Sequence, residues 1–181
     1  MNRYLILVEN RKRYVPSDRR RLIRMIKRAI HQIERINIRI SPRYIEIDIH
    51  TSIGIESLAA HLGKIGLEIY QALNLDVERP RNIDDLCRLI KEYRYWEAHE
   101  ILEDYMDDEH SGVVRWLIMV LAMLVKVQMD QIDIAEKIRS SLVNEGPPSN
   151  KLPQNPIDLQ CVYMKILEGL PEDIYECCIK T

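Results

Sequence analysis

A histidine and two glutamates fall close together in the second half of the chain. Glu100 directly follows His99, and Glu103 comes four residues after the histidine. On a helix, His99 and Glu103 would lie on one face, because residues i and i+4 are stacked one turn apart. An imidazole and a carboxylate so placed can share a divalent metal ion, with a neighbouring glutamate as general base, as in the H-E-x-x-H metalloproteases. One hypothesis is therefore a metal-dependent hydrolase, with His99, Glu100 and Glu103 as catalytic candidates and His99 and Glu103 as metal ligands.

The same residues also suit a purely structural role. Glu103 stands where the metalloproteases have a second histidine, and no obvious third ligand follows on a nearby turn, although His110 or a distant residue could supply one. In this interpretation His99 donates a hydrogen bond to a neighbouring carboxylate in a polar network between helices, and Trp96 fills the core. The helical half would then serve structure or oligomerisation alone.

The segment around these residues carries a resemblance to a known family. Residues 95–103, with the sequence YWEAHEILE, resemble the signature of the DUF309 family of small helical proteins of uncharacterised function. The matching motif residues are Tyr95, Trp96, Glu97, His99, Glu100 and Glu103. The resemblance covers roughly residues 88–143, and it implies a small helical domain in the second half of the chain.

The strongest electrostatic feature is a run of cations near the start of the chain. Helical spacing places Arg20, Arg24, Lys27, Arg28 and Arg35 on a first helix, away from its apolar residues. Such a face attracts phosphate backbones through counterion release, without reading the base sequence. Together with the loop before the helix, the candidate contact residues are Arg11, Lys12, Arg13, Arg20, Arg24, Lys27 and Arg28.

Two other interpretations compete for these cations. They could form an ordinary solvated surface, which is the usual fate of charge runs. They could also dock an acidic protein partner, including this protein's own acidic second half or a second copy in a homo-oligomer.

The hydrophobic pattern of the first half predicts the element order βαββαβ. The apolar run of residues 3–9 predicts a strand, and apolar residues at 22, 26, 29, 30 and 33 recur at helical spacing. Isoleucines then alternate over 36–40 and 45–49 around Ser41-Pro42, which predicts a hairpin. A short helix over 53–62 and a strand from residue 67 complete the order. This is the order of a ferredoxin-like sandwich, with two helices on one face of an antiparallel sheet.

The sheet of this sandwich is not predicted to bind RNA. Residues 43–50 lack the spaced aromatic residues of an RNA recognition motif, and Glu46 and Asp48 are expected on one sheet face, where they would repel RNA. They also do not suit a polymerase-like two-metal site, because the first strand offers no partner aspartate.

The second half is predicted to be helical throughout. The fold class is therefore α+β, a ferredoxin-like βαββαβ sandwich (residues 1–78) followed by an all-α helical array (residues 82–181), with the boundary near residues 76–82 where Pro80 interrupts regular structure. The helices are expected over 82–93, 95–106, 113–129, 132–143 and 156–170, with a short one after Pro171. The apolar helix around residues 116–125 should form the centre of the array.

Charge is divided unequally between the halves. The net charge of −2 is the sum of +6 for residues 1–80 and −8 for residues 81–181. A polyanionic partner is therefore expected to bind the first half. The 26 isoleucines, the abundant arginine, lysine and glutamate, and the absence of phenylalanine are typical of thermophilic, archaeal-type proteins.

The four cysteines show no CxxC spacing, so the sequence does not indicate a zinc ribbon. We expect buried thiols rather than a disulfide, although Cys177 or Cys178 could reach Cys161 if the last two helices pack together. No apolar run is long enough to span a bilayer, and the first residues do not form a secretory signal. We therefore expect a cytoplasmic protein without membrane contact.

The sequence favours a non-enzymatic binding or adaptor protein. Its partner would be nucleic acid or an acidic protein, bound by the basic first helix. The sequence commits to no cofactor, and a divalent metal ion belongs to the hydrolase hypothesis.

Overall fold

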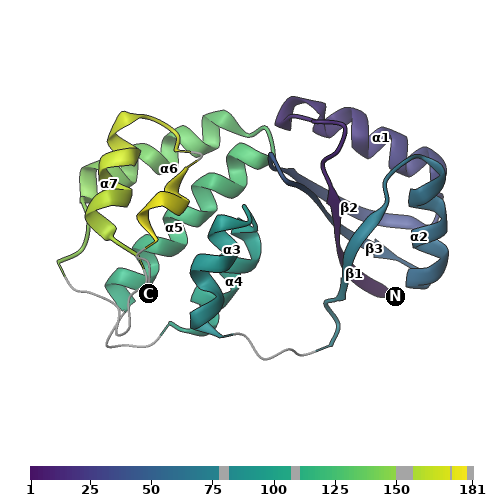
Figure 1. Cartoon of the computed structure of the whole chain (residues 1–181), viewed down its shortest axis with the longest axis horizontal. Coiled ribbons are helices and arrows are strands. Elements are labelled where there is room, and N and C mark those ends of the chain that lie inside the picture. Colours follow the sequence, from purple (N-terminus) through teal and green to yellow (C-terminus); the bar gives the residue numbers. More distant parts are fainter. Residues whose placement is uncertain (78–81, 107–110, 150–156, 172, 179–181) are drawn as a thin grey trace. The chain divides into compact units, whose positions relative to one another are not determined.

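The computed structural model shows an α+β protein (Figure 1). It describes residues 1–77, 82–106, 111–149, 157–171 and 173–178. The chain divides into two compact units, Met1–Arg79 with residues 128–130, and Pro80–Val127 with Gln131–Thr181. Part of the predicted boundary at residues 76–82 lies outside the described residues.

The first unit contains a four-stranded antiparallel sheet with the strand order β2-β3-β1-β4. Helix α1 follows β1, and helix α2 follows β3. The bounds are β1 Asn2–Glu9, α1 Arg19–Ala29, β2 Ile33–Ile40, β3 Tyr44–Thr51, α2 Ile55–Lys64 and β4 Ile69–Asn74. The predicted hairpin is confirmed: the backbone N–H of Ser41 donates to the carbonyl of Tyr44, and the N–H of Tyr44 donates to Oγ of Ser41, both at 2.9 Å.

The core of this unit lies between the sheet and its two helices (Figure 1). Alternate strand residues point to one face of a sheet, so the isoleucines at 36, 38 and 40 and at 45, 47 and 49 enter the same core. Leu22 and Ile26 of α1, and Leu58 and Leu62 of α2, cover them with at most 1% of each side chain exposed. Each such burial stabilises the fold by about 1.5–3 kcal/mol.

Helix α1 is shorter than its apolar spacing predicts. Ile30 already has extended backbone angles, with φ −133° and ψ 100°, and β2 begins at Ile33. The β-branched Ile33 pairs with Thr51 of β3, whose hydroxyl donates to the carbonyl of Gln32. The placement of Arg35 on the first helix is therefore wrong, because this residue lies in β2.

The second unit is helical in its described part. It contains the helices α3 Leu86–Lys91, α4 Tyr95–Asp104, α5 Ser111–Gln128, α6 Ile132–Glu145 and α7 Leu159–Glu168, and the short 3₁₀ turns Ile83–Asp85 and Ile174–Cys177. Asn82 caps the first turn, since its side chain accepts a hydrogen bond from the N–H of Asp84. Pro156, the predicted start of a helix, lies outside the described residues; Asp158 caps α7. Among the described helices, none combines the length and apolar character needed to cross a membrane.

The cysteines differ from the expectation. A disulfide joins Cys161 of α7 to Cys177 in the last 3₁₀ turn, so the prediction of thiols is wrong for these two residues. Cys87 and Cys178 are buried thiols, and Sγ of Cys178 lies 3.9 Å from the carbonyl oxygen of Cys87. Hydrogen bonding between these two thiols raises the pKa of Cys87 and lowers the pKa of Cys178.

Helix α2 ends in a turn that depends on one glycine. Gly66 has φ +77°, its N–H donates to the carbonyl of Gly63, and the N–H of Leu67 donates to that of Leu62. These two bonds form a Schellman motif, which requires a left-handed residue at this position.

Replacing Gly66 with alanine should therefore destabilise the first unit by about 1–2 kcal/mol, because a Cβ is strained in the left-handed region. Gly63→Ala is the matched control: this glycine is helical with open space beside it, and alanine there should stabilise by about 0.5 kcal/mol. Urea unfolding followed by circular dichroism measures both changes. Equal effects of the two substitutions would contradict the assigned role of Gly66.

Candidate functional site

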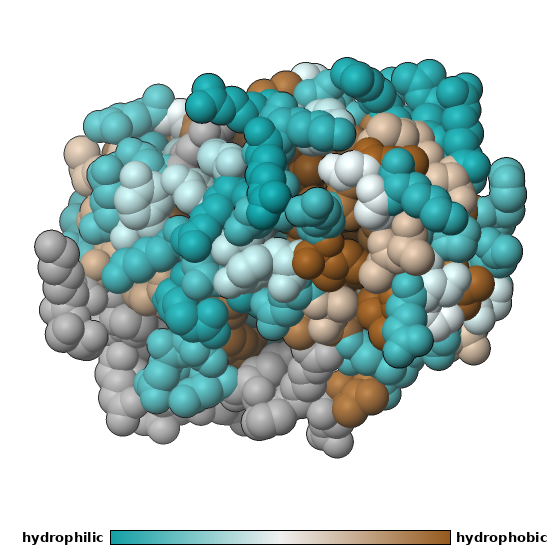
Figure 2. Space-filling view, turned by 45° about the vertical axis from the view of Figure 1, so that its right-hand side comes forward, coloured by the Kyte–Doolittle hydropathy of each residue, from teal (hydrophilic) through white to brown (hydrophobic). Residues whose placement is uncertain are grey.

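The outer face of α1 carries a row of exposed cations. Burial of Leu22 and Ile26 against the sheet turns the opposite side of the helix to solvent, and hydrophilic side chains gather along the upper edge of this unit (Figure 2). We define the basic face as the exposed residues Arg20, Arg24, Lys27 and Arg28. Within the described residues, no carboxylate oxygen lies within 4 Å of these four cationic groups. Their positive charge is therefore not balanced locally.

Arg19 and Arg21 of the same helix behave differently. Arg19 turns toward the sheet, where its Nε donates to the carbonyl of Ile38 at 2.9 Å, and burial lowers its pKa. Arg21 remains exposed and lies 3.9 Å from a carboxylate oxygen of Asp18, at the limit of an ion pair.

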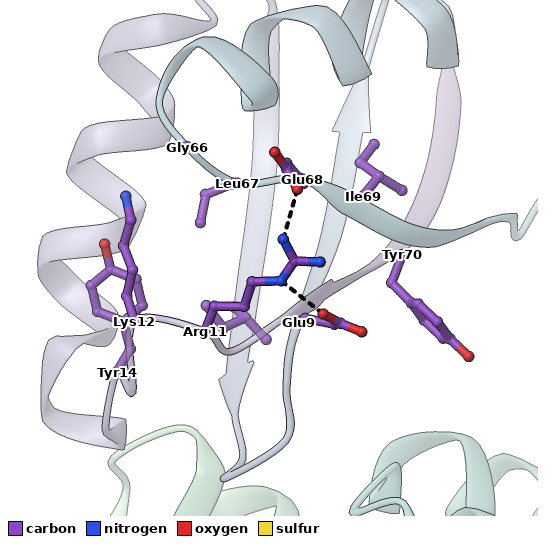
Figure 3. A pocket seen from close by; sticks show the side chains of 10 residues that line it. Glu9, Arg11, Lys12, Tyr14, Gly66, Leu67, Glu68, Ile69 and Tyr70 are labelled. Atoms are coloured by element: carbon purple, nitrogen blue, oxygen red, sulfur yellow. Dashed lines mark hydrogen bonds and ion pairs between the residues drawn. The ribbon is translucent and has the colours of Figure 1, made fainter.

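The predicted contact residues of the preceding loop are not equivalent. Arg11 lies between two glutamates, with Nε 2.9 Å from Glu9 and Nη1 3.1 Å from Glu68 (Figure 3). The hydrogen bond with Glu9 raises the pKa of Arg11. Its charge is therefore balanced, whereas Lys12 and Arg13 are exposed and have no carboxylate within 4 Å in the described part of the chain.

Figure 3 shows the groove to which Arg11 and Lys12 belong, which has a volume of about 330 Å³. Its lining carries two cations, Arg11 and Lys12, and two anions, Glu9 and Glu68. The formal charges cancel, so this groove offers no net attraction for a polyanion.

A second hollow lies beside α1 and has a volume of about 580 Å³. We call it the arginine hollow, because Arg21, Arg24 and Arg28 line it together with Met25, Ala29 and Ile65. Sequence reasoning missed Arg21 and Ile65. The spacing of Arg21, Arg24 and Arg28 by three and four residues signals one helix side, but no local pattern connects them with Ile65.

The face of the sheet opposite the isoleucine core was expected to be acidic, and it is not. Glu46 and Asp48 do lie on the same face of β3, but each has an arginine partner on another strand. Nε of Arg39 lies 2.8 Å from Glu46, directly opposite it in the register, and Arg3 donates two hydrogen bonds of 3.0 and 2.8 Å to Asp48. These cross-strand pairs balance both carboxylates.

The His99 cluster is brought together on α4. One ligand atom from each of His99, Glu100 and Glu103 lies within 4.8 Å of the others, and Nδ1 of His99 is 3.7 Å from an oxygen of Glu103. The Nδ1 atom is buried without a hydrogen-bond partner among the described residues. These three side chains could hold a divalent cation and leave its other positions to water or substrate. His110, the suggested further ligand, lies outside the described residues.

The first residues of the motif make packing and ion-pair contacts. Tyr95 is buried and forms a T-shaped ring pair with Tyr93, and Glu97 accepts two hydrogen bonds of 2.6 and 2.7 Å from Arg94. Burial opposes the charge of Arg94, but Glu97 and then Glu92 outweigh this effect and raise its pKa. Sequence reasoning missed Arg94, because it stands just before the motif.

The comparisons with known proteins found no matching family model, and neither the curated proteins nor the solved structures gave a match to this chain. The resemblance to the DUF309 family therefore stays a prediction that rests on residues 95–103.

The ion pair at the start of α4 gives a stability prediction. Arg94→Met should lower the free energy of unfolding by about 3 kcal/mol, because it removes the buried partner of the partly buried Glu97 carboxylate. Arg88→Met is the control, since Arg88 forms an exposed pair with Asp85 that should contribute less than about 1 kcal/mol. Chemical unfolding of both variants measures the difference, and equal losses would show that the Arg94 pair is not special.

Proposed function

We propose that this protein is a non-enzymatic binding or adaptor protein whose basic face binds the phosphate backbone of a nucleic acid. The observation that carries the proposal is the unbalanced charge of Arg20, Arg24, Lys27 and Arg28. Other cations of the same unit, namely Arg3, Arg11 and Arg39, have carboxylate partners. The basic face lacks such partners in the described part of the chain, so an external anion would replace only water and counterions.

The high negative charge density of a nucleic acid suits the basic face. Helix α1 has 11 residues and a length of about 16 Å, at 1.5 Å per residue. Duplex DNA carries about one negative charge per 1.7 Å of its axis, so several phosphates can lie along a helix of this length. The competing partner for the basic face is an acidic protein, which rarely presents carboxylates at such density.

We also propose a ferredoxin-like fold for residues 1–78 and a DUF309-like domain for residues 82–181. The element order and the strand order β2-β3-β1-β4 support the first proposal. The residues of the motif on α4 support the second.

The salt dependence of binding tests the main proposal. A variant with Arg20, Arg24, Lys27 and Arg28 all changed to glutamine should bind oligonucleotides at least about 100-fold more weakly at 50 mM salt. The slope of log K against log salt should become shallower by about two to four, since each lost phosphate contact removes about 0.9 from it. Fluorescence anisotropy between 50 and 200 mM salt measures both values.

The matched control removes the same charge from the helical unit. It changes the exposed residues Arg88, Lys91, Arg115 and Lys137 to glutamine and should leave affinity and slope nearly unchanged. No binding by the unmodified protein at 50 mM salt, or equal losses in both variants, would contradict the proposal.

A metal-dependent hydrolase is the second candidate function, and the converging ligand atoms of His99, Glu100 and Glu103 favour it. Zinc or manganese at 100 times its dissociation constant should stabilise the protein by about 2.7 kcal/mol, seen as a rise in melting temperature of several degrees. His99→Gln should abolish this rise, whereas His61→Gln on α2 should not. A melting temperature that neither metal changes would exclude this candidate and leave the motif a structural role.

A further inference from the structure

The arginine hollow combines two kinds of surface that a nucleotide also combines. Arg21, Arg24 and Arg28 supply planar guanidinium groups, which bind phosphate oxygens in pairs of parallel hydrogen bonds. Met25, Ala29 and Ile65 supply an apolar surface, which we call the floor. A thioether such as that of Met25 makes favourable contacts with aromatic rings.

The geometry of α1 places the cations beside the floor. Arg21 and Arg28 are seven residues apart, or about 10 Å along the helix axis, with Arg24 between them. Met25 lies four residues after Arg21 and three before Arg28, so its side chain adjoins both cations on the helix surface. Phosphates held by the arginines would therefore leave the attached base near the floor.

The remaining floor residue is held by a different element. Ile65 follows α2, and its N–H donates to the carbonyl of Leu62 at 3.1 Å. The next residue, Gly66, forms the Schellman motif described above. The floor is thus built from two packed elements rather than from a single exposed helix surface.

A duplex and a single strand would use this hollow differently. The bases of a duplex are paired and stacked inside it, so a duplex would contact the arginines but leave the floor exposed to water. A single strand can turn an unstacked base onto a protein surface while its backbone stays on cationic side chains. The hollow, with about 580 Å³, lies within the range of volumes that take small organic ligands.

We propose that the ligand of this unit is a single-stranded nucleic acid, with one base on the floor of Met25, Ala29 and Ile65 and the adjoining phosphates on Arg21, Arg24 and Arg28. This inference rests on the proposed function, because it names the form of nucleic acid that the basic face binds. The sugar and the identity of the base are not distinguished by these contacts.

The test compares three ligands of equal length by fluorescence anisotropy: a single-stranded oligonucleotide, its duplex, and a strand with abasic nucleotides that keeps the phosphates. The protein should bind the single strand about 10-fold more tightly than the abasic strand, since stacking of one base gives an effect of this size. The duplex keeps its bases paired and stacked, so it should bind through its phosphates alone, without a contribution from the floor.

Two substitutions change the floor and keep every arginine. Ala29→Leu fills it, and Ile65→Ser makes it polar; each should weaken binding of the single strand about 10-fold. Binding of the duplex and of the abasic strand, and the salt slope of all three ligands, should not change. Ala60→Leu, at an exposed position of α2, is the matched control. Thermal unfolding checks that the variants are folded, and Ile65→Ser carries the test if Ala29→Leu is not.

The outcomes separate this inference from the proposed function. Equal affinity for the single strand and the abasic strand would overturn the inference and leave phosphate binding by the basic face intact. Unchanged binding of the single strand by both floor variants would do the same. The absence of binding to all three ligands at 50 mM salt would overturn the proposed function and the inference together.

Discussion

Burial of the alternating isoleucines determines where the charges of the first unit can lie. The strands present these side chains to one face of the sheet, and α1 must cover them with Leu22 and Ile26. A helix that buries one stripe of residues has to expose the opposite one. The cations of the basic face are therefore held outward by the core beneath them, although none of them takes part in it.

The first unit contains cations with carboxylate partners and cations without them in the described residues. Arg3 and Arg39 balance carboxylates on the sheet, and Arg11 lies between two glutamates. These arginines join strands or loops to one another. The four residues of the basic face have no carboxylate partner in the described part of the chain, so their positive charge is directed to the solvent. The near-neutral total charge of the protein hides this difference, because the helical half is acidic.

Local sequence patterns were sufficient for most elements but not for the contacts between them. The alternation of isoleucines around Ser41-Pro42 predicts the hairpin, because its period of two is unambiguous over several residues. The end of α1 was misplaced, because Ile33 fits the helical spacing of the stripe and is also a good strand residue. The arginine hollow joins residues of two separate helical segments, and only the fold brings them together. The Cys161–Cys177 disulfide depends on how the last helical segments pack, which the spacing of the cysteines left open.

The left-handed turn at Gly66 has a consequence for how this unit can vary. Ile65 lines the arginine hollow, and Gly66 lines the groove of Arg11 and Lys12. Two neighbouring residues after α2 thus line one hollow each. An insertion or deletion in α2 would rotate this end about the helix axis and displace both borders at once. The two hollows therefore constrain the length of α2 rather than the residue types at its exposed positions, which line neither of them.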